Sequence, residues 1–433
     1  MGILFSVMHE GFAFLDIFAG AGGLSEGFVQ AGFSPVAHVE MDSAACNTLK
    51  TRVAYHWLKG NGKLNVYYDY LAGKISRDNL YKSIPEEVLN SVIQATISKE
   101  TREQIFQFID NHLQGRHLDL IVGGPPCQAY SLVGRARDKN HMVGDKRNYL
   151  YMEYAEFLKQ YKPEYFVFEN VLGLLSAYDT DGIKHFDKMS DCFRNCGYSV
   201  ECRKLNAKSF GVLQNRRRII LVGKRGLNQK DFYPEIRELS TQGSTVNDVL
   251  SDLPKISSGQ GCFGLQPVEE SRENSYLVKS GIKQTGMQSV TLHTARPNNR
   301  RDLEIYRQVV QLWNEKEKRL KYNDLDESLQ THKNKSVFTD RYKVVAGNLQ
   351  YSQTIVAHIA KDGHYYIHPD ISQNRSLSPR EVARIQTFPD DYFFESESGK
   401  PSRTSAYKQI GNAVPVLLAR KVAEAMKLLM QEI

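Results

Sequence analysis

The sequence contains few cysteines, no long apolar run and no internal repeat. Six cysteines among 433 residues are too few for a disulfide-stabilised scaffold, so we expect reduced thiols. No stretch approaches the roughly 20 apolar residues that span a bilayer, and the first residues lack a basic leader followed by a cleavage site. These absences predict a cytoplasmic chain with no membrane partner.

The charge of the chain is modestly basic and unevenly distributed. Lys and Arg number 56 against 49 Asp and Glu, which gives a formal net charge of +7. Between residues 255 and 345 there are 16 basic and 11 acidic residues, among loops rich in Gly, Ser, Asn and Gln. This stretch indicates a separate domain for a polyanionic partner, and an inserted solvated surface remains the alternative.

Short apolar segments alternate with helical patterns over the first half of the chain. Strand candidates rich in Ile, Val, Phe and Leu occur at residues 12–18, 35–40, 119–124, 165–170 and 218–223. Strands of this kind, joined by helices, are typical of a parallel sheet covered on both faces. The sequence therefore predicts an α/β fold with a doubly wound, mostly parallel sheet, whose functional groups lie at the carboxyl ends of the strands.

Chain length and composition predict three regions. A single core seldom exceeds roughly 250 residues, so a chain of 433 residues suits two domains. We expect a first domain over residues 1–225, a smaller loop-rich domain over 226–372, and a segment over 373–433 that returns to the first domain. Within this segment Ser378 is typical of a helix start, and 412–433 has the spacing of an amphipathic helix.

A glycine-rich turn follows the first strand candidate, in the sequence DIFAGAGGLSEG from Asp16 to Gly27. Such a turn lets the backbone approach a ligand closely and directs helix-start amides toward it. Glu40 ends the next strand, where an acid commonly binds ribose hydroxyls. The pattern indicates a nucleoside cofactor, with a tight turn that binds nothing as the alternative. Ser25 replaces the third glycine of the dinucleotide fingerprint, which disfavours a nicotinamide oxidoreductase.

Reactive side chains lie at the ends of three further strand candidates. Cys127 comes after two prolines in GGPPCQAYS, so its thiol is held rigidly at the edge of the sheet rather than in the core. Glu169 ends the 165–170 strand, where its carboxyl group suits proton donation or a hydrogen bond to a ring nitrogen. Arg216 and Arg218 alternate onto one face before the last strand and suit a phosphate or a base oxygen.

A group of cysteines near residue 195 invites comparison with a zinc site. His185, Cys192, Cys196 and Cys202 have ligand-type side chains, but their spacing does not match the usual zinc-binding patterns. We therefore expect no metal.

In the order of these motifs the chain resembles the DNA cytosine carbon-5 methyltransferases of bacterial restriction-modification systems. PPCQ, ENV and QxRxR in this order are together highly specific, and the matching segments cover about half of the chain. They are DIFAGAGGLSEGF, HVEMD, GGPPCQAYS, DKRNYL, PEYFVFENVLGL, FGVLQNRRRIILVG, RSLSPREVARIQTFPDDY and QIGNAVP. The resemblance implies a Rossmann-like domain that binds S-adenosylmethionine, releases S-adenosylhomocysteine and needs no metal, with a target recognition domain over 226–372.

The resemblance also implies catalytic roles. Cys127 matches the nucleophile that adds to carbon 6 of cytosine, and Glu169 matches the acid that contacts ring nitrogen 3 and the exocyclic amine. Arg218, with Arg216, matches the pair that supports the cytosine carbonyl and the nearby backbone. The target carbon is buried in a stacked duplex, so the resemblance implies base flipping.

Further positions match the cofactor pocket of the family. Glu40 would bind the ribose and Met41 would lie beside the adenine. The acid that reads the adenine amine fits poorly, with Asp69 as the candidate and Asp78 or a backbone contact as open alternatives. The remaining matching positions are Phe18, Gly20, Ala21, Gly22, Gly23, Pro125, Leu150, Asn412, Ala413 and Val414.

The expected partner is double-stranded DNA, bound by a monomer, with a cognate restriction endonuclease acting separately on the same target. Polar and basic side chains are suited to phosphates and base edges. We expect DNA contacts from Gln128, Ser131, Arg135, Arg137, Arg300 and Arg301.

Two other functions remain to be weighed. A tRNA cytosine-5 methyltransferase has the same fold but typically a small recognition region, which the long 226–372 stretch disfavours. A catalytically silent DNA-binding relative would have no need of the intact Cys127, Glu169, Arg216 and Arg218.

Overall fold

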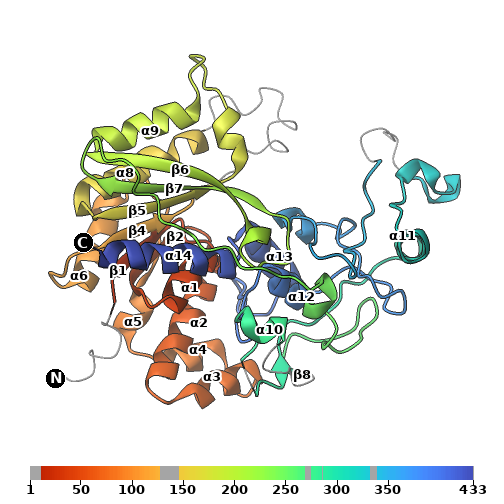
Figure 1. The fold of residues 1–433 in the computed structure, drawn as a ribbon. Coiled ribbons are helices and arrows are strands. Elements are labelled where there is room, and N and C mark those ends of the chain that lie inside the picture. The colour runs from red at the N-terminus through yellow and green to blue at the C-terminus, as the bar shows by residue number, and fades with distance from the viewer. Residues whose placement is uncertain (1–10, 127–145, 269–274, 285, 332–338, 433) are drawn as a thin grey trace.

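A seven-stranded sheet forms the centre of the molecule (Figure 1). The computed structural model describes residues 11–126, 146–268, 275–284, 286–331 and 339–432. The strands lie in the order β3-β2-β1-β4-β5-β7-β6. Their bounds are β1 (Ala13–Ile17), β2 (Ser34–Glu40), β3 (Val92–Gln94), β4 (Leu120–Gly123), β5 (Tyr165–Asn170), β6 (Tyr198–Asn206) and β7 (Arg217–Arg225).

The predicted mostly parallel sheet is confirmed, and all five strand candidates are strands. β1 to β5 pair in parallel, whereas β7 runs antiparallel between β5 and β6. The segment 207–216 joins β6 to β7 without an α-helix, and only a strand that runs back antiparallel can be reached by so short a connection. β3 is only three residues long, too short for its apolar pattern to predict a strand.

Helices cover both faces of the sheet. The α-helices of the described residues are α1 (Gly23–Gln30), α2 (Ser43–Gly60), α3 (Leu64–Leu71), α4 (Arg77–Lys82), α5 (Glu86–Asn90), α6 (Arg102–Leu113), α8 (Leu150–Tyr161), α9 (His185–Asn195), α10 (Tyr276–Lys279), α11 (Arg300–Lys316), α12 (Pro379–Ile385), α13 (Arg403–Asn412) and α14 (Val416–Gln431). One face of the sheet packs against α6, α8 and α9, and the other against α1 and α14. Two short strands, β8 (Gln266–Pro267) and β9 (Ser289–Val290), form a separate pair.

Alternate side chains of the strands enter two different cores. Leu15 of β1 packs with residues of α6, α8 and α9, whereas its neighbour Phe14 packs with residues of α1 and α14. This alternation follows from the two-residue period of a strand. The predicted C-terminal helix is confirmed as α14, which lies beside α1 (Figure 1).

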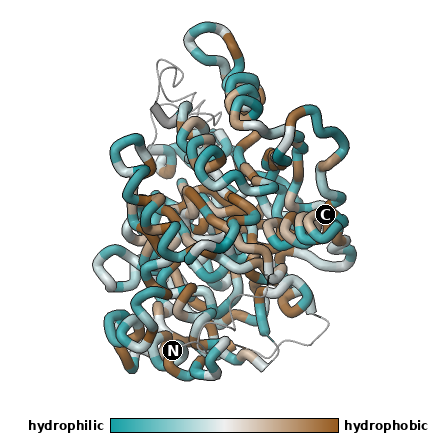
Figure 2. Tube along the Cα trace, turned by 90° about the vertical axis from the view of Figure 1, so that its left-hand side faces the viewer, coloured by the Kyte–Doolittle hydropathy of each residue, from teal (hydrophilic) through white to brown (hydrophobic). Residues whose placement is uncertain are grey.

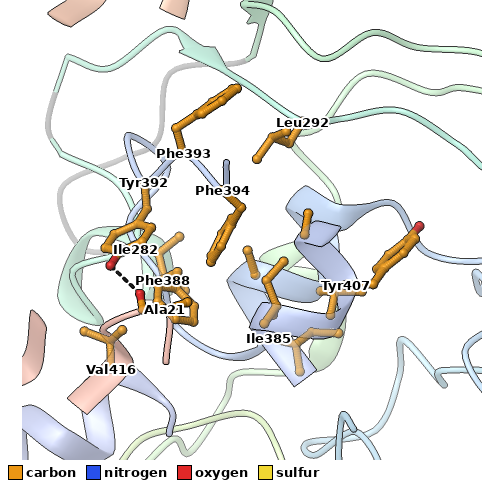
Figure 3. Close-up of a cluster of buried hydrophobic side chains, with 14 of the residues drawn as sticks. Ala21, Ile282, Leu292, Ile385, Phe388, Tyr392, Phe393, Phe394, Tyr407 and Val416 are labelled. Carbon is orange, nitrogen blue, oxygen red and sulfur yellow. Dashed lines mark hydrogen bonds between the residues drawn. The ribbon is translucent and has the colours of Figure 1, made fainter. Parts of the chain in front are cut away.

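A third core joins distant parts of the chain. It includes residues of α2 and α3, of the 246–292 stretch, of 345–366 and of the run from Leu377 to Phe394 (Figure 3). In the Cα tube of Figure 2 many hydrophobic segments run through the interior, while hydrophilic segments lie mostly at the outside. Because this core draws on all three expected regions, the division at residues 225 and 372 stays a prediction.

The predicted helix start at Ser378 is confirmed. Its hydroxyl accepts a hydrogen bond from the Glu381 amide at 3.3 Å, and the Glu381 carboxylate accepts one from the Ser378 amide at 2.6 Å. This reciprocal capping satisfies two amide groups of a buried helix end. It fixes α12 within the third core.

Candidate active site

The glycine-rich turn has a left-handed backbone at several positions. Phe18, Gly20 and Gly22 have φ angles of 58°, 55° and 78°. Left-handed conformations favour glycine and let β1 turn sharply into α1, which begins at Gly23. The Gly20 amide donates to Oε2 of Glu40 at 2.8 Å, and the Met41 amide donates to Oε1 of Glu40 at 2.8 Å. The structure therefore places the Glu40 carboxylate against the turn, as the cofactor prediction requires.

The loop after α13 closes on the same turn. A Cβ atom on Gly23 would lie 2.5 Å from the carbonyl oxygen of Val414 and 3.2 Å from Cβ of Ala413. Asn412, the last residue of α13, is exposed next to this contact. On the other side of the turn the Tyr392 hydroxyl donates to the Ala21 carbonyl at 2.6 Å (Figure 3). Parts of the sequence almost 400 residues apart thus meet at one turn.

Asp16, at the end of β1, is a functional candidate that the sequence reasoning missed. Its side chain is 1% exposed, and neither carboxylate oxygen accepts a hydrogen bond of good geometry. Burial and the neighbouring Glu40 raise the pKa of Asp16 well above its usual range, partly offset by the Ser25 amide. The signal was present as a carboxyl group within the apolar strand FAFLDIF.

Three predicted cofactor residues lie on other elements. Met41 follows β2 and is 59% exposed, and Leu150 begins α8. Pro125 is buried after β4, and its carbonyl accepts a hydrogen bond from Nδ2 of Asn170 at 3.3 Å. This bond ties the segment after β4 to the end of β5.

The structure does not bring Asp69 to the turn. Asp69 lies on α3, and its carboxylate pairs with Lys74 at 2.8 Å on the surface. The strand beside Glu40 is β3, whose Gln94 lies opposite Glu40 in the sheet register, and Asp78 is exposed on α4. Three helices, α3, α4 and α5, lie between α2 and β3, so Asp69 belongs to a helix and not to the strand next to Glu40. Its assignment to the adenine amine stays a prediction.

Glu169 and Arg218 form an ion pair at the sheet edge. Oε1 of Glu169 lies 2.7 Å from Nε of Arg218, with the two side chains 13% and 12% exposed. Oε2 of Glu169 lies 2.8 Å from the position that a Cβ on Gly124 would occupy. Gly124 follows β4 directly, so β4, β5 and β7 all contribute to this corner.

Several predicted residues fall outside the described part of the chain. Cys127, the predicted nucleophile, comes one residue after the described segment that ends at Pro126. The predicted DNA contacts at Gln128, Ser131, Arg135 and Arg137 also lie outside the described residues. The structure nevertheless describes Gly124 to Pro126, which lead from the Glu169 corner toward Cys127.

Arg216 donates hydrogen bonds to backbone carbonyl groups of distant segments. It is 1% exposed, and its guanidinium donates to the carbonyl oxygens of Ile355, Gly411 and Ala413. Arg217 points outward and is exposed, as alternation along the strand predicts. Arg216 therefore holds other parts of the chain in place, whereas Arg218 contacts Glu169.

The other predicted DNA contacts, Arg300 and Arg301, are exposed in the first turn of α11. Asn299 caps this helix by accepting a hydrogen bond from the Asp302 amide at 2.8 Å. Figure 1 shows α11 projecting from the part of the molecule away from the sheet. Both guanidinium groups are therefore accessible to a partner.

Two negative findings hold for the described residues, which are 11–126, 146–268, 275–284, 286–331 and 339–432. Within these ranges no three His, Cys, Asp or Glu side chains gather into a group that could hold a metal ion. Nor does any helix in the same ranges have the length and apolar character needed to cross a membrane.

Comparison with known proteins identifies the family. The model of the C-5 cytosine-specific DNA methylases matches residues 12–63 and 81–428. The Type II methyltransferase M.Bpa9945I of Bacillus paralicheniformis is 40% identical, with 95% of this chain and 98% of that protein covered. The Type II methyltransferase M1.HphI of Haemophilus parahaemolyticus is 27% identical, with 95% and 86% covered.

A solved structure shares the fold. A prophage-encoded protein from E. coli superposes with a TM-score of 0.62 at 20% identity, with 97% of this chain and all of that chain covered. The sheet and its helices thus form a fold of the α/β class. The chain belongs to the C-5 cytosine-specific DNA methylase family, and it is a DNA (cytosine-5-)-methyltransferase. Asp69 lies in the interval 64–80 that the family model leaves unmatched.

Proposed function

We propose that the enzyme transfers a methyl group from S-adenosylmethionine to carbon 5 of cytosine within one double-stranded DNA sequence. The methylated sequence would be protected from a cognate restriction endonuclease, a role supported by the Type II methyltransferases among its relatives. The observation that carries the proposal is the Glu169–Arg218 pair beside Gly124, three residues before Cys127.

The turn and its neighbours suit this cofactor. A buried carboxyl group without good hydrogen bonds at Asp16 favours a ligand that carries positive charge. Glu40 is held by the amides of the turn, and the 413–414 loop packs on Gly23. When bound, S-adenosylmethionine would supply an activated methyl group. Residues Phe18 to Gly23, Glu40, Met41, Pro125, Leu150 and Asn412 to Val414 would form its pocket, without a metal.

The chain's own residues would activate the cytosine. The Cys127 thiolate adds to carbon 6 and makes carbon 5 nucleophilic. Glu169 donates a proton to ring nitrogen 3, which offsets the negative charge that develops on addition, and accepts a hydrogen bond from the exocyclic amine. Once carbon 5 carries the methyl group, with S-adenosylhomocysteine as the leaving product, its proton would pass to a base such as solvent water. The electron pair of that bond would form the carbon 5–carbon 6 double bond and expel the Cys127 thiolate, which restores the aromatic ring. Arg218 orients Glu169 and supports the cytosine carbonyl.

The recognition step requires DNA contacts beyond this corner. The enzyme would extrude the target cytosine from the duplex, since carbon 5 and carbon 6 are inaccessible in the stack. Residues 226–372 would read the target sequence, with Arg300 and Arg301 on phosphates or base edges. Gln128, Ser131, Arg135 and Arg137 would contact DNA from the segment after Cys127. Residues 1–225 and 373–433 would form the catalytic domain of a cytoplasmic monomer.

Bisulfite sequencing tests the methylated atom and the target together. Unmodified plasmid DNA is incubated with the protein and S-adenosylmethionine, and methylated cytosines are expected in one sequence context. Cys127→Ser should abolish methylation while S-adenosylhomocysteine binding, measured by calorimetry, stays within about twofold. Methylation by this variant at the parent rate would remove Cys127 from the mechanism.

A trapping experiment tests the covalent step itself. Duplexes with 5-fluorocytosine at the mapped target cannot lose the substituent at carbon 5, so the parent enzyme should remain attached to the DNA when the methyl donor is present. The adduct is detected by denaturing gel electrophoresis. Absence of an adduct with the active parent enzyme would refute the covalent route.

A further inference from the structure

We propose that Gln214 and Gln386 are positioning residues that couple the recognition region to the loop over the cofactor turn. The inference rests on the proposed use of S-adenosylmethionine and on DNA recognition by residues 226–372. It assigns to two buried amide side chains the task of making DNA binding and cofactor binding interdependent.

On the recognition side, Gln214 holds a segment around Ile355. Its Oε1 accepts a hydrogen bond from the Ile355 amide at 2.9 Å. Around it the backbones pair directly, because the Ser352 amide donates to the Leu213 carbonyl and the Asn215 amide donates to the Ser352 carbonyl, both at 3.0 Å. The segment 352–355 therefore follows any movement of residues 213–215.

The amide group of Gln214 reaches α12 with its other end. Its Nε2 donates to Oε1 of Gln386 at 2.9 Å and to the Ile385 carbonyl at 3.2 Å. Both glutamine side chains are 0% exposed. Each of these hydrogen bonds would be lost without replacement by water if one partner moved alone.

Gln386 continues the connection to the loop over the cofactor turn. Its Nε2 donates to the carbonyl oxygens of Ile410 at 2.8 Å and Ala413 at 3.1 Å. The Val416 amide donates back to the Gln386 carbonyl at 3.1 Å. An unbroken set of hydrogen bonds thus joins Ile355 to Ala413, and Ala413 packs against Gly23 at the edge of the glycine-rich turn.

Arg216 makes the same connection on a second path. One guanidinium nitrogen donates to the Ile355 carbonyl and another to the Ala413 carbonyl. α13 also packs directly on the recognition region, since a Cβ on Gly411 would lie 2.3 Å from the Ala357 amide nitrogen. Residues 352–357 and residues 410–413 are therefore in close contact, and a shift of the first segment must displace the second.

The consequence is a reciprocal effect on affinity. If DNA shifts residues 352–357 into the arrangement in which the 410–413 loop fits the cofactor, DNA must tighten cofactor binding by the factor by which cofactor tightens DNA binding. Removing the Gln386 amide should uncouple the two events without removing a group that touches either ligand.

The test measures this coupling at equilibrium. Calorimetry gives the Kd of S-adenosylhomocysteine for the full-length protein alone and bound to a duplex with the target mapped by bisulfite sequencing. We expect duplex to tighten binding by about tenfold in the parent, within the usual range of such couplings. In Gln386→Met this ratio should fall below about threefold. A ratio near one in the parent, or an unchanged ratio in the variant, would overturn the inference.

Gln409→Met is the matched control. Gln409 is also a buried glutamine, 6% exposed, whose amide bonds to Glu395, Ser405 and Thr48, away from the recognition region. The Gln409→Met variant should lose stability as Gln386→Met does. It should keep the parent's ratio of the S-adenosylhomocysteine Kd without duplex to the Kd with duplex. Equal loss of the ratio in the control would reduce the effect to general destabilisation and refute the specific role.

A milder variant protects the test against misfolding. The Thr354 hydroxyl donates to the Asn215 carbonyl at 2.6 Å at the more exposed end of the connection. Thr354→Val should lower the ratio by about twofold with the melting temperature nearly unchanged. If Gln386→Met does not fold, the proposal is overturned when Thr354→Val has the same Kd ratio as the parent enzyme. Failure of the proposed function would appear separately, as absent methylation by the parent enzyme.

Discussion

Oε1 of Glu169 lies 2.7 Å from Nε of Arg218, across the antiparallel pair of β5 and β7. The two side chains come from strands that run in opposite directions, which is why both can reach the same edge of the sheet. Gly124 leaves room for the second carboxylate oxygen. The pair orients a carboxylate toward the segment that carries Cys127.

Loss of the Arg218 guanidinium should slow methyl transfer strongly. Arg218→Gln leaves Glu169 without its charged partner, and we expect kcat to fall by about 100- to 1000-fold, as for removal of one donor from a charged transition state. Arg225→Gln is the control, because Arg225, at the other end of β7, pairs with Glu164 just before β5 at a partly exposed position. Single-turnover methylation of the mapped duplex gives the rates. A parental rate in Arg218→Gln would contradict the assigned role.

Enlarging Gly23 should displace the loop at the cofactor turn. The added Cβ of Gly23→Ala would lie 2.5 Å from the Val414 carbonyl oxygen, so the 413–414 loop must move. We expect S-adenosylhomocysteine affinity to fall by at least about tenfold and stability by about 1–3 kcal/mol. Gly62→Ala, with a φ of 68° and open space around its Cβ, reports backbone strain alone. Equal cofactor affinity in the two variants would exclude the contact as a determinant.

Asp16→Asn should change stability in a pH-dependent way. The carboxyl of the unfolded chain titrates near about 4, whereas burial and Glu40 raise the pKa of Asp16 in the folded protein. The folded state therefore holds its proton to higher pH, and stability is lost as pH rises from about 4 through the folded pKa. Asn carries no such penalty, so the variant should be more stable at pH 8 by about 1 kcal/mol or more.

Urea unfolding of the unliganded protein at pH 5 and pH 8 measures this difference, which should shrink toward pH 4. A pH-independent difference would show that the carboxyl is not the cause. The same variant should bind S-adenosylmethionine more weakly, because a neutral amide no longer attracts a positively charged ligand.

A buried ion cluster holds α1, α2 and the third core together. The Arg52 guanidinium lies 2.6 Å from Glu26 and 2.8 Å from Asp391. Burial alone would raise the pKa of Glu26, but Arg52 and His56 hold it far below its usual range. Arg52→Met leaves two buried carboxylates without this partner, so we expect a loss of about 3–5 kcal/mol in unfolding free energy.

Lys74→Met is the control for this loss. Lys74 pairs with Asp69 on the surface, with the two side chains 70% and 40% exposed, and its removal should cost less than about 1 kcal/mol. Denaturant unfolding at pH 7 gives both values. A loss in Arg52→Met as small as in the control would refute the structural role of the cluster.

Arg300 and Arg301 should contribute to DNA affinity through phosphates. If each contacts one phosphate, the double variant Arg300→Gln, Arg301→Gln should flatten the slope of log Kd against log salt concentration by about 1.8. Arg307→Gln is the control on the same helix, because Arg307 pairs with Glu304. Fluorescence anisotropy between 50 and 200 mM salt measures the slope. An unchanged slope in the double variant would remove α11 from the DNA interface.

Local patterns predicted the sheet and much of the site. The five strand candidates, the glycine-rich turn with Glu40 and the helix start at Ser378 depend on nearest neighbours in the chain, and the structure contains each of them. The Asp69 assignment depended on counting residues from Glu40 and stays untested. Three helices lie between α2 and β3, and the spacing alone did not indicate that Asp69 belongs to the first of them.

Arg216 illustrates a second limit. Its place in the QxRxR motif predicts, together with Arg218, support for the cytosine carbonyl and the nearby backbone. The motif does not indicate which carbonyl groups its guanidinium contacts, and these lie 139 to 197 residues away in the chain. Hydrogen bonds of this kind depend on which backbone groups end up buried without partners. That is known only once distant segments are packed.

The order of the motifs, by itself, determined the family, its methylation of cytosine at carbon 5 and the sheet with its glycine-rich turn. Each of these depends on residue types a few positions apart and on the periods of 2.0 residues in strands and 3.6 residues in helices. Only the tertiary structure decided that Ile355, Gln214, Gln386 and Ala413 form one buried connection, and that Asp16 lies without good hydrogen-bond partners. These facts depend on the close packing of segments hundreds of residues apart. Packing removes amide and carboxylate groups from water, and the neighbouring segments decide which of these groups then have a hydrogen-bond partner.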